Sequence, residues 1–310
     1  MYKSNTNAKD NIDKDELENH TISENDLKYY KKDIDYKKLT PSSKKLFDKY
    51  RNVDTESVQF RLNEQKKIKE NNEEEYLDLA LLNLSIIPCV FETSLKFLFI
   101  SDNNLITLGN LSNLVNLKAL DCSNNKLTSL NNLPKNLTEL ICSHNNLNTL
   151  DCSYLPYLQI LDCGYNEMSF LNYGNNLKML ECENNKLTTL HPTKSTTTLI
   201  TLHCHNNFLT TLPNYKILKF LNCSKNQITK LCDYKMLEEL YCDNNKISNL
   251  SNLPSIQIIS CNHNSGITLP YFDKLQEISI DIENSCISSK YKILATYKSK
   301  TTILIFFQFD

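Results

Sequence analysis

Apolar residues recur through the middle of the chain in a repeating unit of about 20 residues. Residues 117–130 read LKALDCSNNKLTSL, residues 137–150 read LTELICSHNNLNTL, and residues 177–190 and 237–250 keep the same order. The shared template is L-x-x-L-x-C-x-x-N-x-L-x-x-L. Its second apolar position falls at Leu77, Leu98, Leu120, Leu140, Leu161, Leu180, Leu202, Leu221, Leu240, Ile259 and Ile278. Neighbouring members lie 19–22 residues apart, so the pattern predicts a stack of about 11 units.

Each unit is predicted to contain one short strand. In the L-x-C part, alternate side chains point to one face of a strand, so Leu and Cys share the core and the residue between them faces away. Ordering about 20 residues costs ~30 kcal/mol. Burying about five to seven apolar side chains returns only ~1.5–3 kcal/mol each. A single unit is therefore unstable alone, and stacking must stabilise it.

An asparagine occupies one position of nine units and predicts a hydrogen-bonded ladder. The column consists of Asn103, Asn125, Asn145, Asn166, Asn185, Asn207, Asn226, Asn245 and Asn264. Where the chain leaves each strand, backbone groups are buried without partners, and a short amide side chain can satisfy them. Leu82 and Glu283 replace Asn in the first and last units, as expected for units that cap the stack.

This template resembles the leucine-rich repeat, with Cys where a third Leu often stands. The resemblance covers about residues 76–285. It implies an α/β-type solenoid, a curved arc with a parallel sheet on its concave face and mostly extended or 3₁₀ segments on its convex face. Lysine outnumbers arginine 32 to 2 and tryptophan is absent. Together with the Cys-for-Leu replacement, this bias is similar to that of leucine-rich repeat proteins from amoeba-infecting giant DNA viruses.

The two flanks differ from the repeats. Residues 1–75 are predicted to be a charged segment, partly disordered, with short capping helices. Residues 54–70 place Val58 and Leu62 at helical spacing after Asp54, which favours a helix that caps the first repeat over one that binds a partner. Residues 286–310 end in TTILIFFQF, too short to cross a bilayer, and are predicted to be a C-terminal cap.

Composition excludes several functional classes. The chain of 310 residues has a net charge of -2 and only two arginines, which argues against nucleic-acid or anionic-membrane binding. Its four glycines do not form a phosphate-binding loop, and no common catalytic motif is present, so we expect no cofactor and no enzymatic activity. The first 20 residues do not resemble a secretory signal.

Eight of the 12 cysteines fill a single template position and are predicted to be buried thiols, because stacked rungs hold them too far apart for good disulfides. These are Cys122, Cys142, Cys163, Cys182, Cys204, Cys223, Cys242 and Cys261. Free thiols predict an intracellular, reducing compartment, which is the host cytoplasm if the protein is viral. Cys89, Cys152, Cys232 and Cys286 lie outside the column and are predicted to be the more reactive thiols.

The concave face is the predicted partner-binding surface, because its side chains alternate with the buried ones. The candidate residues are Asp121, Ile141, Ile160, Asp162, Met179, Glu181, Glu183, His203, His205, Phe220, Tyr241 and Asp243. A mixed apolar, aromatic and polar surface of this kind suits a protein interface. Glu181, Glu183, His203 and His205 are also weak candidates for a divalent metal site. We favour a solvated surface cluster over metal binding at these four residues.

The sequence therefore predicts a non-enzymatic interaction scaffold that is monomeric and binds a protein partner. One alternative is a substrate-recognition adaptor for a ubiquitin ligase or phosphatase that acts through residues 1–75. An enzyme similar to the bacterial effectors that join such repeats to a ubiquitin-ligase domain would need far more than the 25 residues that follow the repeats.

Overall fold

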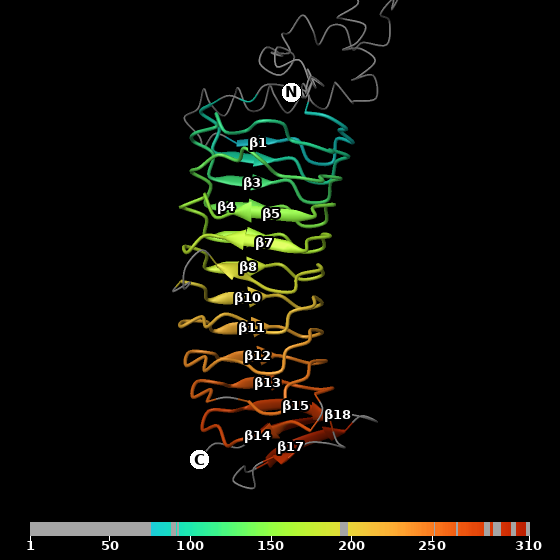
Figure 1. Ribbon diagram of the computed structural model, residues 1–310, viewed down its shortest axis with the longest axis vertical. Helices are drawn as coiled ribbons and strands as arrows, with labels where there is room; N and C mark the ends of the chain where they lie inside the picture. Colours follow the sequence, from blue (N-terminus) through green and yellow to red (C-terminus); the bar gives the residue numbers. More distant parts are fainter. Residues whose placement is uncertain are drawn as a thin grey trace, which may run out of the picture.

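The computed structural model describes residues 76–87, 91, 93–192, 198–250, 252–264, 266–281, 286–287, 293–298 and 302–307. The described chain forms short strands joined by turns, stacked one above another (Figure 1). None of the described residues is helical, and no membrane-spanning helix occurs among them. The helices predicted within residues 1–75, the Asn-position residue Glu283 and Cys89 lie outside the described residues.

Thirteen strands form the main sheet. In spatial order they are β1 (Tyr76–Asp78), β2 (Phe97–Phe99), β3 (Ala119–Asp121), β4 (Glu139–Ile141), β6 (Ile160–Asp162), β8 (Met179–Glu181), β10 (Thr201–His203), β11 (Phe220–Asn222), β12 (Glu239–Tyr241), β13 (Ile258–Ser260), β15 (Glu277–Asp281), β18 (Thr302–Phe307) and β17 (Ile293–Lys298). The strands from β1 to β15 pair in parallel, and the leucines of the template lie opposite one another, for example Leu180 and Leu202. Each rung is therefore one predicted repeat.

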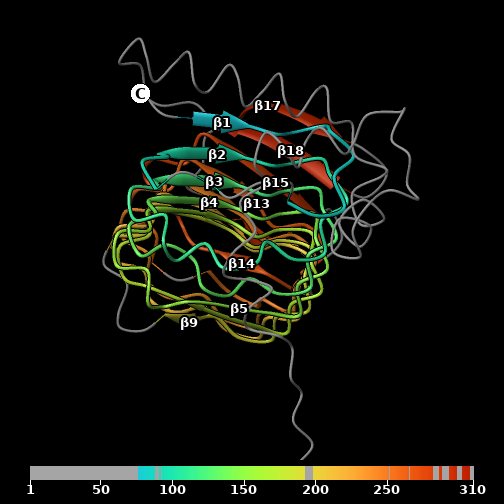
Figure 2. The ribbon, with the colours of Figure 1, turned by 90° about the horizontal axis from the view of Figure 1, so that it is seen from above.

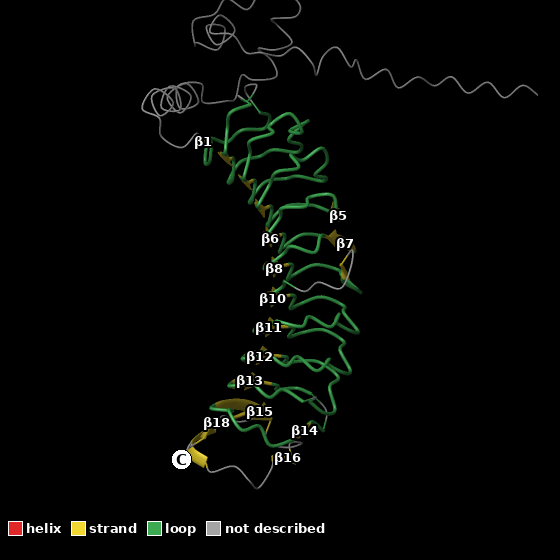
Figure 3. Cartoon of the chain, turned by 90° about the vertical axis from the view of Figure 1, so that its left-hand side faces the viewer, coloured by secondary structure: helices red, strands yellow, loops and turns green. Residues whose placement is uncertain are grey.

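Two smaller sheets lie on the opposite side of the stack. One contains β5 (Thr149–Cys152), β7 (Phe170–Tyr173) and β9 (His191–Pro192), and the other contains β14 (Thr268–Leu269) and β16 (Cys286–Ile287). The view from above separates β1–β4 from β5 and β9 (Figure 2). The side view shows the main sheet on the inner curve of an arc, with β5, β7, β14 and β16 on the outer curve (Figure 3). The predicted arc is confirmed, and its described convex side consists of strands, turns and other extended segments without 3₁₀ helix.

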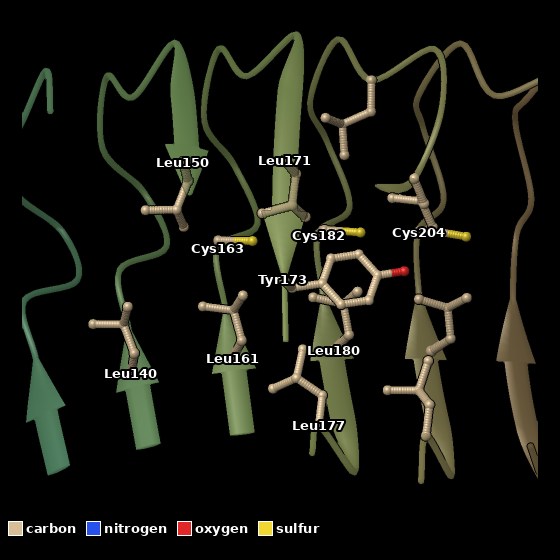
Figure 4. Packing of buried hydrophobic residues seen from close by; sticks show 14 of the residues in the cluster. Leu140, Leu150, Leu161, Cys163, Leu171, Tyr173, Leu177, Leu180, Cys182 and Cys204 are labelled. Atoms are coloured by element: carbon tan, nitrogen blue, oxygen red, sulfur yellow. The ribbon is translucent and has the colours of Figure 1, made fainter. Parts of the chain in front are cut away.

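The core between the two sides is a column of leucines and thiols. All eight cysteines predicted to be buried are at most 1% exposed and carry no disulfide. The sulfur atoms of Cys163, Cys182 and Cys204 follow one another along the stack beside the strand leucines (Figure 4). Burial raises the pKa of the Cys223 thiol to about 12, so it remains protonated.

The prediction for the cysteines outside this column is wrong for Cys152. Its side chain, in β5, is completely buried, and burial raises its pKa to about 12. The thiol lies in the core because β5 is paired with β7, so alternate residues of β5 point inward. Cys232 is half-buried, as expected for a more accessible thiol.

The asparagine ladder is confirmed in all nine predicted rungs. In a typical rung, the Asn226 amide nitrogen donates to the carbonyl oxygens of Cys204 (3.0 Å), Cys223 (3.0 Å) and Ser224 (3.3 Å). The Asn226 amide oxygen accepts from the Leu209 N–H at 2.9 Å. Each side chain therefore joins its own rung to the preceding rung. In the first unit, where Leu82 replaces Asn, the Leu82 N–H donates to Asn103 of the next rung.

The residue before the ladder position has a positive φ in ten rungs. These residues are Leu81, Asp102, Asn124, His144, Tyr165, Asn184, Asn206, Lys225, Asn244 and His263, with φ between 50° and 61°. Side chains other than Gly and Asn are disfavoured in this left-handed conformation. The same left-handed turn joins each strand to its ladder residue, so the ladder residues recur at the same position of successive rungs.

Three tyrosines fill the core towards the convex side. Tyr173, Tyr215 and Tyr234 are completely buried. The hydroxyl groups of Tyr173 and Tyr215 lie 2.6 Å apart, and the Tyr234 hydroxyl donates to the Pro213 carbonyl oxygen at 2.9 Å. Each polar end therefore has a partner inside the core, as a buried hydroxyl requires.

An antiparallel hairpin follows the last parallel strand. β18 pairs with β15 through the register Ile278 opposite Ile305, and β17 pairs with β18. Strand β18 therefore runs against the parallel rungs, and the edge strand β17 runs with them again. The boundaries predicted at residues 75, 76, 285 and 286 stay predictions.

Candidate concave interaction surface

The strand residues on either side of each buried leucine form the concave surface. In the three-residue strands from β4 to β13, the middle residue is buried and both neighbours are half-buried. Because successive side chains of a strand point to opposite faces, these neighbours point away from the core. Parallel pairing then aligns equivalent residues of successive rungs into columns.

We define the concave face by three such columns. The first column is Tyr76, Phe97, Ala119, Glu139, Ile160, Met179, Thr201, Phe220, Glu239, Ile258 and Glu277. The second column is Asp78, Phe99, Asp121, Ile141, Asp162, Glu181, His203, Asn222, Tyr241, Ser260 and Ser279. The third column follows the buried position of each rung and contains Ser101, Ser123, Ser143, Gly164, Glu183, His205, Ser224, Asp243, Asn262 and Asp281.

All 12 residues predicted as binding candidates lie in these columns and are half-buried. Ile160, Met179 and Phe220 belong to the first column, and Glu183, His205 and Asp243 belong to the third. The other six, Asp121, Ile141, Asp162, Glu181, His203 and Tyr241, are in the second. The structure thus brings the candidates together on one surface, and their binding role stays a prediction.

An aromatic row crosses β10, β11 and β12. The rings of His203 and Phe220 stack at a centroid distance of 4.8 Å and an interplanar angle of 14°. Phe220 lies 5.5 Å from Tyr241, with the rings tilted by 35°. Neighbouring strands carry these rings in two adjacent columns, so they form a continuous aromatic surface over three rungs.

Three carboxylates gather on β6, β8 and the residues just after β8. Asp162 lies opposite Glu181 in the parallel register, and Glu183 follows Glu181 by two residues. Burial and the negative charges of Asp162 and Glu181 raise the pKa of Glu183 to about 7. Burial and Asp162 also raise the pKa of Glu181. We name Asp162, Glu181 and Glu183 the carboxylate cluster.

Comparison with known proteins identifies the repeating unit. A family model described as leucine-rich repeats in two copies matches residues 93–135. The rung within this match, from β2 to β3, recurs along the whole parallel part of the main sheet. Residues 93–135 thus match the leucine-rich repeat family, and the solenoid has the leucine-rich repeat fold.

Relatives of the chain include one from a mimivirus. The chain is 31% identical over 140 residues to a leucine-rich repeat protein of Acanthamoeba polyphaga mimivirus. This match covers 37% of this chain and 33% of that protein. It is 33% identical over 124 residues to the oligodendrocyte-myelin glycoprotein of Homo sapiens, covering 37% of this chain and 28% of that protein. The matched region thus spans a third or less of each relative's length.

Solved structures also share the fold of the leucine-rich repeat domain. YopM from Yersinia enterocolitica superposes with a TM-score of 0.52 at 23% identity, over 74% of this chain and 65% of that chain. This likeness concerns the fold alone.

The leucine-rich repeat surface does not assemble the metal site considered from the sequence. Among the described residues, no three His, Cys, Asp or Glu side chains gather closely enough to hold a metal ion. Glu183 lies over Gly164, where an added Cβ would come 2.8 Å from its Oε1 atom. Its carboxylate therefore turns towards β6, whereas His205 belongs to the rung on the other side. Burial and the neighbouring His203 lower the pKa of His205.

Five further carboxylates of the concave face were not among the sequence candidates. They are Asp78, Glu139, Glu239 and Glu277 in the first and second columns and Asp281 in the third. The sequence candidates were the residues beside each column cysteine, beginning at Asp121, together with apolar residues of the first column. Acidic residues of the first column were therefore left out. Reading the third residue of L-x-x-L in every unit would have found Glu139, Glu239 and Glu277.

Proposed function

We propose that the protein is a non-enzymatic scaffold whose concave face binds a protein partner. Leucine-rich repeat proteins typically mediate protein–protein interactions and generally act as scaffolds without catalysis. The observation that carries the proposal is the continuous surface of the three columns. Its centre combines apolar and aromatic side chains with polar neighbours, the composition of a protein interface.

The geometry of the repeat supports binding on this side. The backbone of each rung is fixed by the parallel ladder and by the asparagine bonds, so the surface side chains are held on a rigid frame. Ile141, Ile160 and Met179 are half-buried on adjacent strands and form an apolar part beside the aromatic row. A rigid frame lowers the conformational entropy lost on binding.

A pair of matched substitutions tests the choice of face. Thr201→Tyr adds a bulky neutral side chain in the first column between Met179 and Phe220. Thr211→Tyr makes the same change at an exposed position outside the columns. The two variants and the wild-type full chain are used as bait in native cells, with quantitative mass spectrometry. We expect Thr201→Tyr alone to reduce recovery of the specific partner by about tenfold or more.

The reverse pattern of the two substitutions would contradict the proposal. If Thr211→Tyr abolishes recovery and Thr201→Tyr does not, the partner binds outside the concave face and the proposal is wrong. The thermal midpoints of both variants serve as the folding control. The adaptor alternative depends on residues 1–75, which lie outside the described residues.

We also propose that the protein works in an intracellular, reducing compartment. The support is the free thiols: all ten cysteines whose side chains the structure describes are free, and nine of them are buried. A fluorescent fusion imaged in the native cell, followed by thiol mapping of the recovered protein, tests this location. Secretion, or recovery with intermolecular disulfides, would contradict it.

A further inference from the structure

Charge is separated by position on this solenoid. Ten carboxylates lie in the three columns, Asp78, Asp121, Glu139, Asp162, Glu181, Glu183, Glu239, Asp243, Glu277 and Asp281. No lysine or arginine occupies a column position. The described lysines of the repeats all lie elsewhere, at Lys96, Lys118, Lys126, Lys135, Lys178, Lys186, Lys216, Lys219, Lys225, Lys230, Lys235, Lys246 and Lys274, and Lys298 lies in the hairpin strand β17. Since the chain as a whole has a net charge of only -2, this asymmetry follows from placement and not from composition.

Acidic residues outside the concave face include two with lysine partners. Glu167 pairs with Lys186, and Glu238 pairs with Lys219 at 2.8 Å. By contrast, the carboxylate cluster has only neutral hydrogen-bond donors in the described structure. Asp162 accepts from the Ser143 hydroxyl at 2.6 Å and from the Gly164 N–H at 3.1 Å. The buried Oε2 atom of Glu183 has no hydrogen-bond partner there.

The carboxylate cluster is electrostatically unfavourable as it stands. Asp162 and Glu181 are direct neighbours in the sheet, and like charges on adjacent strands repel. Burial, followed by the neighbouring negative charges, raises the pKa values of Glu181 and Glu183. A cation docked on the cluster from outside would relieve the repulsion between the carboxylates.

The aromatic row supplies a second feature suited to cations. Phe220 lies between the rings of His203 and Tyr241, and Tyr241 ends the row three strands away from Glu181. A guanidinium or ammonium group over such a ring is attracted by its negative face. Arginine fits both features better than lysine, because its planar group bonds carboxylates with two parallel hydrogen bonds and also stacks on rings.

We propose that the concave face docks a protein partner through an extended segment rich in arginine and lysine. The cationic groups bind the carboxylate cluster, and a further arginine packs on Tyr241 at the end of the aromatic row. Rungs are spaced ~4.8 Å apart and an extended chain advances ~3.3 Å per residue, so a ten-residue segment crosses about seven rungs. This inference rests on the proposed function and specifies the chemistry of the partner.

Binding of labelled deca-arginine to the full chain tests the proposal by fluorescence anisotropy. The test variant is Glu181→Gln with Glu183→Gln. Its matched control is Glu167→Gln with Glu238→Gln, which removes the same charge outside the face. We expect the test variant to weaken binding about tenfold and the control less than about twofold. Tyr241→Leu should weaken deca-arginine more than deca-lysine, because the stacking contribution is larger for arginine.

Several outcomes would overturn the proposal. Equal weakening in the test and control variants would mean that the peptide responds to net charge alone. The proposal also fails if deca-arginine does not bind at 50 mM salt, since electrostatic attraction is strong under that condition. A dimer in light scattering that the test variant dissociates would assign the surface to a second copy of the chain.

The same variants separate this inference from the proposed function. If recovery of the native partner is lost with Thr201→Tyr but retained with the Glu181 and Glu183 double variant, the scaffold stands and the basic partner is excluded. If deca-arginine binds as expected while both variants recover the native partner normally, the charge preference stands and the proposed function falls. Thermal midpoints within about 3 °C of the wild type confirm that each variant is folded.

Discussion

Asn226 provides the sharpest test of what holds the rungs together. Its amide oxygen is the acceptor for the Leu209 N–H, and no other acceptor for that group occurs in the described structure. Its amide nitrogen reaches three carbonyl oxygens, two of them on cysteines. Replacing Asn226 with alanine removes all four contacts from a site that is only 8% exposed.

The expected loss follows from which groups keep a partner. The Cys204 carbonyl still accepts from Asn207, the Cys223 carbonyl from Asn245, and the Ser224 carbonyl from the Asn206 N–H. Only the Leu209 N–H is left without a bond, which costs ~1–3 kcal/mol. Weaker bonding of the three carbonyls adds about 1 kcal/mol. We therefore expect Asn226→Ala to lower the free energy of unfolding by ~2–4 kcal/mol.

Urea denaturation followed by far-UV circular dichroism measures this loss. With a slope of about 3 kcal/mol per molar urea, the midpoint should fall by about 1 M. Hydrogen exchange should locate the defect, with faster exchange in peptides that contain Leu209 and the flanking rungs. Asn214→Ala is the control, because Asn214 is exposed, and it should change stability by less than about 0.5 kcal/mol. A midpoint for Asn226→Ala equal to that of Asn214→Ala would refute the ladder as a source of stability.

Three further predictions concern single side chains. Iodoacetamide should label Cys232 in the native protein before it labels Cys152, and peptide mapping would contradict this if both react at the same rate. Lys225→Asn should raise the free energy of unfolding by about 0.5–1 kcal/mol, because Lys225 has a φ of 55° and Asn tolerates this conformation better. The control Lys230→Asn, at an exposed site, should not raise it, and calorimetry of both variants measures the difference. Glu183 binds its proton more tightly in the folded state, since its pKa is raised to about 7, so its contribution to stability falls as pH rises from about 4.5 through 7. After allowance for the partial exposure of Glu183, the Glu183→Gln variant should be more stable than wild type at pH 8 by ~1–2 kcal/mol. At pH 4.5 the two proteins should have similar stability. Equal melting temperatures at pH 8 would contradict the raised pKa of Glu183.

The rungs could be predicted because every unit places the same residue in the same surroundings. Cys182 and Asn185 have the same neighbours as Cys204 and Asn207, one rung along. A column of identical residues therefore reports a repeated environment, and the alternation of the strand then assigns its faces. The positions of the concave residues followed from this alternation.

The convex side could not be predicted in the same way. Tyr215 and Tyr234 each lie three residues before the first leucine of a unit, whereas Tyr173 lies four residues before Leu177, so the three tyrosines do not share one template position. Their burial depends on how each return segment packs in space. Cys152 is buried for the same reason, through the pairing of β5 with β7 that no template position indicates.

The direction in which individual side chains point could not be predicted from the sequence either. Spacing alone placed Glu183 near His205, but the carboxylate turns towards Gly164, where the missing side chain leaves room. The exclusion of lysine from the concave face was missed because it requires comparing all three columns together. Each unit considered separately shows only one or two acidic residues.

The hairpin of β17 and β18 has a consequence for how copies of the molecule can associate. A stack of parallel rungs could in principle continue from one molecule to the next and grow head to tail into a fibre. Here β18 runs antiparallel to β15 and β17 runs antiparallel to β18, so the edge strand β17 again runs in the direction of β15. Strand direction alone therefore does not block a β1 strand of a second molecule. The register of β17 against β18 shifts between Ile293 and Ala295, however, and irregular edge strands hinder further pairing. The hairpin therefore acts as a terminator by placing an irregular strand, and not another repeat, at that end of the sheet.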